Sequence, residues 1–255
     1  MHKSTPPTFP FSLCKITTPL KITAWQLYLA SHPDQAYAQY ILDGIAHGFQ
    51  IGYAYTASVT CNSATSNHPS ANEHPDVISD GLQQEVKKGQ LVGPLDSREY
   101  PYIHMSSLGA IPKKHSPDKW RLILDLSHPK GQSVNDGIDR SICSLSYMKA
   151  DDVVQVLSLG RGTLLAKIDI KSAFRNVPVH SHDRHLLRIQ WDGQLYVDTV
   201  LPFGLHSTPK IFNCIADAPQ WIAKRRGISY LDHYWMTSSP PVPLNARNVA
   251  RIYSH

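Results

Sequence analysis

The chain has 255 residues, of which 42% are hydrophobic and 18% charged, and its formal net charge is +5 with a pI near 9.0. This composition is typical of a globular protein with a sizeable core, and it excludes a largely disordered chain. No apolar run reaches the roughly 18 residues that a membrane span needs, so we expect no membrane partner. The N-terminus has prolines and polar residues where a signal peptide needs an apolar run, which favours an intracellular protein, cytoplasmic or nuclear.

Cysteines and histidines give few indications of a metal centre. The four cysteines are far apart and form no CxxC motif, which argues against a structural zinc site or a disulfide framework. The stretch VHSHDRH at 179–185 could hold a metal. No third ligand type lies nearby at helical spacing, so a solvated loop is the favoured prediction.

The chain divides into zones by composition. Residues 1–56 are expected to form a helical extension, in which DQAYAQYILDGIAHGF reads as a helix capped by Asp34. Residues 57–78 are rich in Ser, Asn and Thr and predict a polar linker or long exposed loop. From about residue 79 the pattern predicts continuous structure.

Two β-hairpins are expected in this last zone. The first is LGAIPKKHSPDKWRLILDLS (108–127), with its turn at residues 115–118. The second is HLLRIQWDGQLYVDTVLPFG (185–204), whose Asp192-Gly193 pair is a strong type I′ turn signal. Between them, LLAKIDIKSAF (164–174) predicts a strand that runs into a turn.

Two helices complete the pattern. DDVVQVLSLGRG (151–162) has a capping aspartate, apolar residues at helical spacing and terminal glycines. STPKIFNCIADAPQWIAKRRG (207–227) is capped by Ser207 or Thr208 and ended by Gly227. Pro219 lies inside this second helix, where a proline costs about 3 kcal/mol, so it conflicts with the local prediction.

Single residues leave their roles open. Asp169, at the end of an apolar strand, could be a capping residue or an oxygen ligand for a hard divalent cation. The first hairpin is basic, which is usually a solvated surface but also suits a triphosphate site. Gly204 could bring the backbone close to a flat ligand or simply make a turn.

The order of these motifs is more specific than any one of them. The segments KWRLILDLS (119–127), AKIDIKSAFRNVPV (166–179), LPFGLHSTPKIF (201–212) and SYLDHY (229–234) together resemble the reverse transcriptases. The fuller text is similar to the polymerases of DIRS-type tyrosine-recombinase retrotransposons. The resemblance covers roughly residues 25–250.

The resemblance implies an α+β fold with fingers and a partial palm, the palm being an antiparallel sheet backed by helices. We expect the fingers at 79–160, the partial palm at 161–238 and a truncated tail at 239–255. Neither a thumb nor an RNase H domain is expected in this chain; both would belong to the parent polyprotein.

For catalysis, the resemblance implies two Mg²⁺ ions held by Asp169, by the backbone carbonyl of Ile170 and by Asp232. In the family these ions neutralise the triphosphate and activate the primer 3′-hydroxyl for in-line attack. The reaction is template-directed transfer of a deoxynucleotide from a dNTP to the primer.

The resemblance also implies a nucleotide site. Phe174 matches the steric gate that excludes a ribose 2′-hydroxyl. Lys113 and Arg121 match the pair that grips the triphosphate, and Phe203 and Gly204 match the segment against the nascent base pair. The template–primer duplex would be held mainly through its phosphates.

One departure from the family pattern affects the activity. The family has two adjacent aspartates after a tyrosine, whereas here Asp232 is followed by His233. Either His233 replaces the second aspartate, or His233-Tyr234 aligns with the residues that precede the pair, which is then deleted; the spacing from Trp221 favours deletion.

We therefore predict a degenerate, pseudogene-like copy with impaired or no polymerase activity. Two alternatives remain open. One is a non-catalytic remnant that binds nucleic acid, and the other is a retroelement fossil without a selected role.

Overall fold

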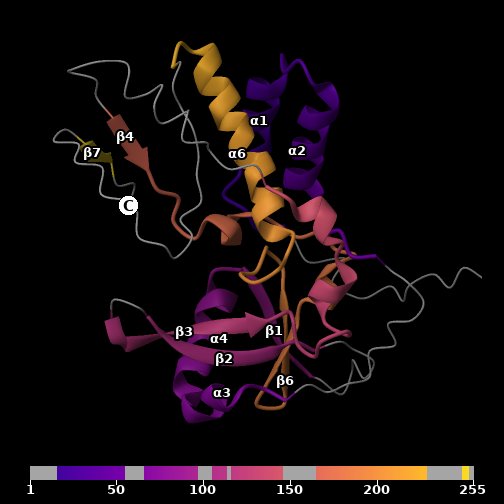
Figure 1. Cartoon of the computed structure of the whole chain (residues 1–255), viewed down its shortest axis with the longest axis vertical. Coiled ribbons are helices and arrows are strands. Elements are labelled where there is room, and N and C mark those ends of the chain that lie inside the picture. The colour runs from indigo at the N-terminus through magenta and orange to yellow at the C-terminus, as the bar shows by residue number, and fades with distance from the viewer. Residues whose placement is uncertain are drawn as a thin grey trace, which may run out of the picture.

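The computed structural model describes residues 16–54, 66–96, 105–113, 116–145, 165–228 and 249–252. In Figure 1, helices α1, α2 and α6 gather at the top, and a β-rich part with helices α3 and α4 lies at the bottom. Buried side chains form two clusters, one among the three upper helices and one within the β-rich part. We call them the helical core and the sheet core.

The helical core joins two early helices of the chain to a late one. It is formed by α1 (Ile22–Leu29), α2 (Gln35–His47) and α6 (Thr208–Arg225), with α1 contacting both of the others. The helix expected after Asp34 is confirmed as α2. Its predicted cap is confirmed as well, because the Asp34 carboxylate accepts a hydrogen bond from the Tyr37 backbone N–H at 2.9 Å. Ile41 and Ile45 on this helix are buried in the core.

Helix α6 confirms the helix expected over 207–227, including its continuation through Pro219. One face of α6 buries Ile211, Phe212, Ile215 and Ala218 in the helical core. Burying an Ile or Phe side chain stabilises by roughly 1.5–3 kcal/mol each, which together exceeds the cost of about 3 kcal/mol for an internal proline. Packing therefore outweighs the local conflict.

The first expected hairpin is confirmed as β2 (Ser107–Lys113) paired antiparallel with β3 (Ser116–Asp125). The register pairs Lys113 with Ser116, so the strand begins where the sequence predicted the turn. The predicted turn at 115–118 is thus placed too far along the chain. Its proline and polar residues signalled a turn, but cross-strand pairing decides where the strand starts.

The second expected hairpin is also confirmed, as β5 (Arg188–Trp191) and β6 (Gln194–Asp198). Asp192 and Gly193 have φ of 47° and 70°, as a type I′ turn requires. Strand β6 pairs on its other side with β1 (Leu91–Asp96), so the antiparallel sheet has the order β1-β6-β5.

The polar linker expected over 57–78 is wrong for its second half. Residues there form α3 (Pro69–Glu73) and the start of α4 (Pro75–Lys87), each with a proline in the first turn. The polar side chains bond the edge of β2: Asn67 accepts from the Leu108 N–H at 2.9 Å, and Ser70 accepts from the Ala110 N–H at 3.1 Å. Their role is to satisfy a strand edge, which a Ser/Asn-rich composition does not reveal.

The contiguous division into fingers at 79–160 and palm at 161–238 does not follow the two cores. Strands β5 and β6, expected in the palm, share a sheet with β1, in which β6 pairs with both β1 and β5. Ile189 of β5 is buried in the sheet core with Leu82 and Leu108. The chain crosses from one part to the other and back because sheet pairing joins segments far apart in sequence.

The remaining strands are short. β4 (Leu165–Ile168) confirms the strand before Asp169, and it pairs in parallel with β7 (Val249–Ile252), which lies in the region expected to be only a tail. The helix predicted over 151–162 lies outside the described residues. Within the described part of the chain, no helix is long and apolar enough to cross a membrane.

The solvated loop predicted for VHSHDRH is wrong for three of its residues, because Val179, Asp183 and Arg184 are buried. The Asp183 carboxylate accepts a hydrogen bond from the Ile51 N–H at 2.8 Å, and the Arg184 Nε donates to the Val179 carbonyl at 3.0 Å. This segment therefore ties residues 49–51 to the helical core. Among the described residues, no group of three or more ligating side chains could hold a metal ion.

Candidate active site

The predicted metal carboxylate lies at an exposed turn. Asp169 follows directly after β4, and both Asp169 and Ile170 are exposed. The turn that follows contains Ser172 with φ 52° and ψ 39°, a left-handed conformation that is unusual for serine. This turn reverses the chain and brings Phe174, in the short 3-10 helix η5 (Ala173–Asn176), back toward the core.

The structure brings two predicted nucleotide-site residues together. The rings of Phe174 and Phe203 lie with centroids 5.1 Å apart, although the residues come from different segments. Phe174 also packs edge-to-face against Phe212 of α6 at 5.7 Å. The inner phenylalanine is half-buried, whereas Phe203 is 60% exposed. An exposed aromatic ring supported by buried ones offers a flat apolar surface to a ligand.

The predicted glycine also has a specific environment. Gly204 has φ 90°, and a Cβ there would come within 3.4 Å of the Leu124 carbonyl oxygen of β3. The loop before α6 thus lies against the base of the β2–β3 hairpin. A side chain at Gly204 would strain the backbone and crowd this contact.

The two basic residues of the predicted triphosphate site lie on the hairpin, and both are exposed: Lys113 ends β2, and Arg121 lies in β3 opposite Ile111. In Figure 1 the hairpin tip and the end of β4 lie on the same side of the view. Asp232 lies outside the described residues, so its place relative to Asp169 stays a prediction.

Sequence reasoning missed the ion network beneath the site. Arg175, next to Phe174, donates from Nη1 to both carboxylate oxygens of Asp198 at 2.8 and 2.7 Å. It also donates from Nε and Nη2 to Glu85 at 3.0 and 2.7 Å. The partners are 23 and 90 residues away, so no local pattern could have indicated them. The network fixes η5 between α4 and β6.

The ionisation of this network follows from its geometry. Burial by itself lowers the pKa of the Arg175 guanidinium, but the Asp198 and Glu85 carboxylates outweigh burial and raise it. Burial by itself raises the pKa of Glu85, and the Lys88 and Arg175 contacts lower it below its ordinary value. For Asp198, burial raises the pKa and Arg175 opposes that shift. At Asp198 burial is the larger of the two effects, so the pKa of that carboxyl is raised overall.

The chemistry of the predicted metal ligands suits a hard cation. Asp169 offers an exposed carboxylate with no hydrogen bond or ion pair to any of the described residues. The exposed Ile170 adds a backbone carbonyl beside it. Oxygen donors of this kind bind Mg²⁺ when substrate phosphates and water complete the shell.

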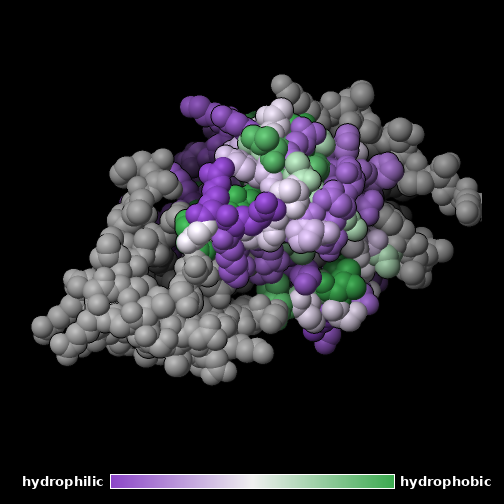
Figure 2. Space-filling view, turned by 90° about the horizontal axis from the view of Figure 1, so that it is seen from above, coloured by the Kyte–Doolittle hydropathy of each residue, from purple (hydrophilic) through white to green (hydrophobic). Residues whose placement is uncertain are grey.

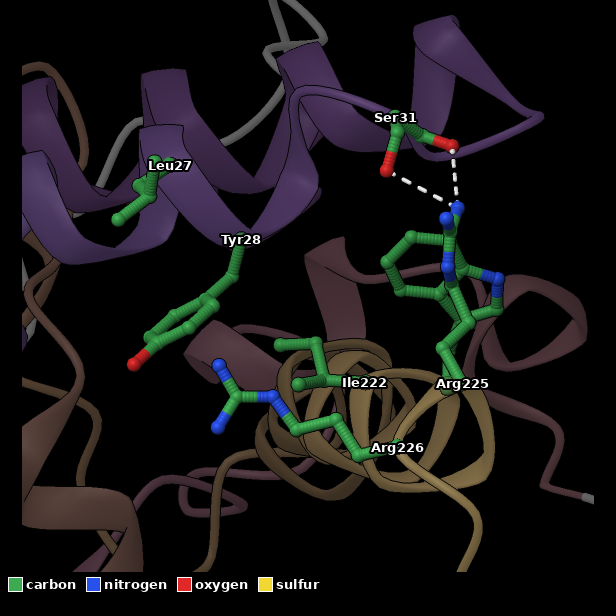
Figure 3. A pocket seen from close by; sticks show the side chains of 7 residues that line it. Leu27, Tyr28, Ser31, Ile222, Arg225 and Arg226 are labelled. Atoms are coloured by element: carbon green, nitrogen blue, oxygen red, sulfur yellow. Dashed lines mark hydrogen bonds between the residues drawn. The ribbon is translucent and has the colours of Figure 1, made fainter.

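A separate pocket of about 380 Å³ lies at the other end of α6, between that helix and α1. Arg225 donates from Nη1 to the Ser31 carbonyl and hydroxyl oxygens, and Arg226 lies 5.0 Å from the Tyr28 ring centroid. Figure 3 shows the two guanidinium groups pointing in different directions, so they do not converge on one ligand. None of the predicted catalytic residues lines this pocket.

Figure 2, seen from above, shows hydrophobic residues scattered among hydrophilic ones on this end of the molecule. The hydrogen bonds from Arg225 to Ser31 join α6 to the residues just after α1. The candidate active site is instead the region of Asp169, Phe174 and Phe203.

Comparisons with known proteins show which family the chain is similar to. The family model "Reverse transcriptase (RNA-dependent DNA polymerase)" matches residues 111–245, which include Asp169, Phe174, Phe203 and Arg121. Over 152 residues, 58% of the chain, the sequence is 26% identical to the retrovirus-related Pol polyprotein from transposon 412 of Drosophila melanogaster. The chain spans 11% of that polyprotein's length.

Solved structures with a related arrangement are foamy viral protease–reverse transcriptases. One, in complex with ds DNA, has a TM-score of 0.47 at 15% identity and covers 86% of this chain and 38% of that chain. Another, in complex with RNA/DNA hybrid, has a TM-score of 0.48 at 15% identity, with 86% of this chain and 29% of that chain covered.

The mixed helix and antiparallel-sheet fold and the family match define a retroelement polymerase domain. The chain belongs to the reverse transcriptase family, whose members are RNA-directed DNA polymerases and use divalent metal ions. The predicted family is therefore confirmed, as is the relation to retrotransposon Pol polyproteins.

Proposed function

We propose that this chain is the reverse transcriptase domain of a DIRS-type retrotransposon, and that it binds a dNTP with Mg²⁺ while catalysing nucleotide transfer poorly or not at all. The observation that carries the proposal is the contact between the Phe174 and Phe203 rings, whose centroids lie 5.1 Å apart. Phe174 follows the exposed Asp169 by five residues in the chain. A flat aromatic wall, with an exposed carboxylate five residues before Phe174 in the chain, suits a base-bearing ligand that brings a metal on its phosphates.

We assign the roles as follows. Asp169 and the Ile170 carbonyl would hold the metal, with Asp232 as the remaining carboxylate candidate. Phe174 would face the sugar and Phe203 the base, because the first ring is half-buried and the second is exposed.

The exposed hairpin supplies the phosphate contacts in this proposal. Lys113 and Arg121 would approach the triphosphate, and Gly204 would let the loop lie close to the nascent base pair. We assign the sheet core with its hairpin to the fingers and the helical core to the palm. The template–primer duplex would be RNA or DNA, held through phosphate contacts that do not depend on sequence.

Impaired catalysis is proposed from the sequence around Asp232. In Tyr230-Leu231-Asp232-His233, either His233 stands where the family has its second aspartate, or the whole aspartate pair is missing after Tyr234. Losing one carboxylate removes charge that must hold two cations, and an imidazole nitrogen is a poor ligand for Mg²⁺. Losses of several powers of ten in rate are ordinary for such ligands.

Primer extension with Mg²⁺ and dNTPs tests this proposal. We expect the wild-type chain to incorporate no more nucleotide than an Asp169→Ala variant. Equilibrium dNTP binding, measured in parallel, should be present in the wild type and at least about tenfold weaker in Asp169→Ala, a difference of about 1.4 kcal/mol. Robust incorporation by the wild type would overturn the impairment, and absence of dNTP binding would overturn the site.

A second variant separates the two alignments of the palm hairpin. His233→Asp creates an adjacent aspartate pair after Leu231. If Asp232 is the palm-hairpin aspartate, incorporation should rise well above the wild-type level. If the pair has been deleted and Asp232 is a bystander, His233→Asp should stay at the level of Asp169→Ala.

The alternative function is a domain that binds nucleic acid without catalysis, favoured by the net charge of +5 and the exposed Lys113 and Arg121. Binding to a primer–template duplex should then weaken as salt rises, with a linear dependence of log affinity on log salt. Lys113→Ala and Arg121→Ala should each reduce the slope by about one. A slope near zero in the wild type would count against phosphate contacts.

A further inference from the structure

The loop that carries Phe203 and Gly204 is held by one buried side chain from another segment. Asn135 lies in the 3-10 helix η3 (Val134–Gly137) and is 2% exposed. Its Nδ2 donates to the Gly204 carbonyl at 2.8 Å, and its Oδ1 accepts from the His206 N–H at 2.8 Å. One carboxamide thus bonds two backbone groups of the loop.

Asn135 is itself fixed in place. Its backbone N–H donates to the Leu126 carbonyl at 3.0 Å, and its Nδ2 donates also to the Ser127 hydroxyl at 2.9 Å. Leu126 and Ser127 directly follow β3, so the carboxamide joins the base of the β2–β3 hairpin to the loop before α6. Both of its N–H donors and its carbonyl oxygen are used.

Other contacts also hold this loop. Leu205 is buried in the helical core, the Thr208 hydroxyl donates to the Pro202 carbonyl at 3.0 Å, and the Phe203 ring packs on Phe174. Asn135 bonds the two residues on either side of Leu205, Gly204 and His206. Phe203, next to Gly204, keeps 60% of its surface exposed.

We infer that Asn135 is a positioning residue, which sets the place of Phe203 and Gly204 relative to the hairpin and thereby the affinity of the site for a dNTP. This inference rests on the proposed nucleotide site. An asparagine is needed because the position must donate to one backbone group and accept from another. An aspartate at 135 keeps the acceptor but places a carboxylate oxygen against the Gly204 carbonyl oxygen.

The test compares Asn135→Asp with a matched variant, Asn67→Asp. Asn67 also joins two backbone groups, donating to the Gln190 carbonyl at 3.2 Å and accepting from the Leu108 N–H at 2.9 Å. Both of these partners lie in the sheet part and outside the 200–208 segment, so the Asn67 variant has a similar loss of bonding. Urea midpoints show whether the two variants are comparably stable.

Two readouts are measured on the full chain. Hydrogen exchange of the 200–208 segment, without ligand, should be at least about tenfold faster in Asn135→Asp and unchanged in Asn67→Asp. Affinity for dTTP with Mg²⁺ should fall at least about tenfold in Asn135→Asp and less than about twofold in Asn67→Asp.

The outcomes separate the inference from the proposed function. If the wild type binds no dTTP, the proposed function fails, and the exchange readout still decides whether Asn135 holds the loop. Unchanged exchange in Asn135→Asp overturns the inference, as does faster exchange with unchanged dTTP affinity. If Asn135→Asp does not fold, Ser127→Ala replaces it: this variant removes one support of the carboxamide and should give smaller changes of the same sign in both readouts.

Discussion

Removing Arg175 should destabilise the protein more than removing any exposed arginine. Its guanidinium makes four hydrogen bonds to the carboxylates of Asp198 and Glu85, at 2.7 to 3.0 Å. The Asp198 side chain is 4% exposed, and that of Arg175 is 11% exposed. Breaking a buried ion pair by removing one partner costs about 3–5 kcal/mol, because the remaining charge is left buried without its counter-ion.

We therefore expect Arg175→Ala to lower the free energy of unfolding by about 3–5 kcal/mol. Domains of this kind are stable by about 5–15 kcal/mol, so part of the Arg175→Ala protein could already be unfolded in buffer. Arg175→Lys is the measurable alternative. It keeps the charge but cannot bond both carboxylates with a planar fork, so we expect a loss of roughly 2 kcal/mol.

The assay is urea denaturation followed by circular dichroism, with Arg121→Ala as the control because Arg121 is exposed on β3. The control should change stability by less than about 0.5 kcal/mol. The combination of Arg175→Met with Asp198→Leu should be less destabilising than the sum of the single changes by at least about 1 kcal/mol. A loss below about 1 kcal/mol for Arg175→Ala, or strict additivity, would refute the role assigned to the network.

Three further predictions concern other parts of the fold. Gly193→Ala should cost about 1 kcal/mol, because Gly193 has φ 70°, which strains an alanine even though no atom lies within 4 Å of its Cβ position. Gly81→Ala inside α4 should instead stabilise the protein by roughly 0.5–1 kcal/mol. Thermal unfolding of the two variants shows whether the signs are opposite. Tyr37→Phe should cost about 1 kcal/mol in urea denaturation, because the Tyr37 hydroxyl donates to the Cys214 carbonyl at 2.6 Å; an unchanged urea midpoint would contradict this. The pKa of Glu85 is lower in the folded protein than its unfolded value of about 4.3, so the ionised carboxylate stabilises the fold above that pH. This stabilisation is lost as the pH falls through the pKa of Glu85 in the folded protein. In urea titrations, Glu85→Gln should therefore lose less stability than the wild type between pH 5 and 3, and equal losses would contradict the prediction.

Local signals in the sequence determined several elements of the fold. Asp34 caps α2, Asp192-Gly193 turns the second hairpin, and the Ser207-Thr208-Pro209 segment begins α6. Each depends on residues within one turn of one another, so the physical cause is contained in a short segment. The order of the motifs likewise determined the family, which the match over residues 111–245 confirms.

The tertiary structure decided what depends on distant partners. The polar segment at 66–78 forms helices because Asn67 and Ser70 satisfy the edge of β2, some 40 residues away. Pro219 is tolerated because one face of α6 is buried in the helical core. Composition predicted a linker in the first case and a conflict in the second, since neither the strand edge nor the core is visible locally.

The same division applies to the candidate site. Motif order pointed to Asp169, Phe174 and Phe203, but the contact between the two rings and the supports beneath them are tertiary facts. Arg175 and Asn135 lie within or near the recognised motifs without any local sign of their partners. Buried polar groups must be satisfied wherever the fold brings a partner, so the sequence determined which residues bear the chemistry, and only the folded chain decided what holds them in place.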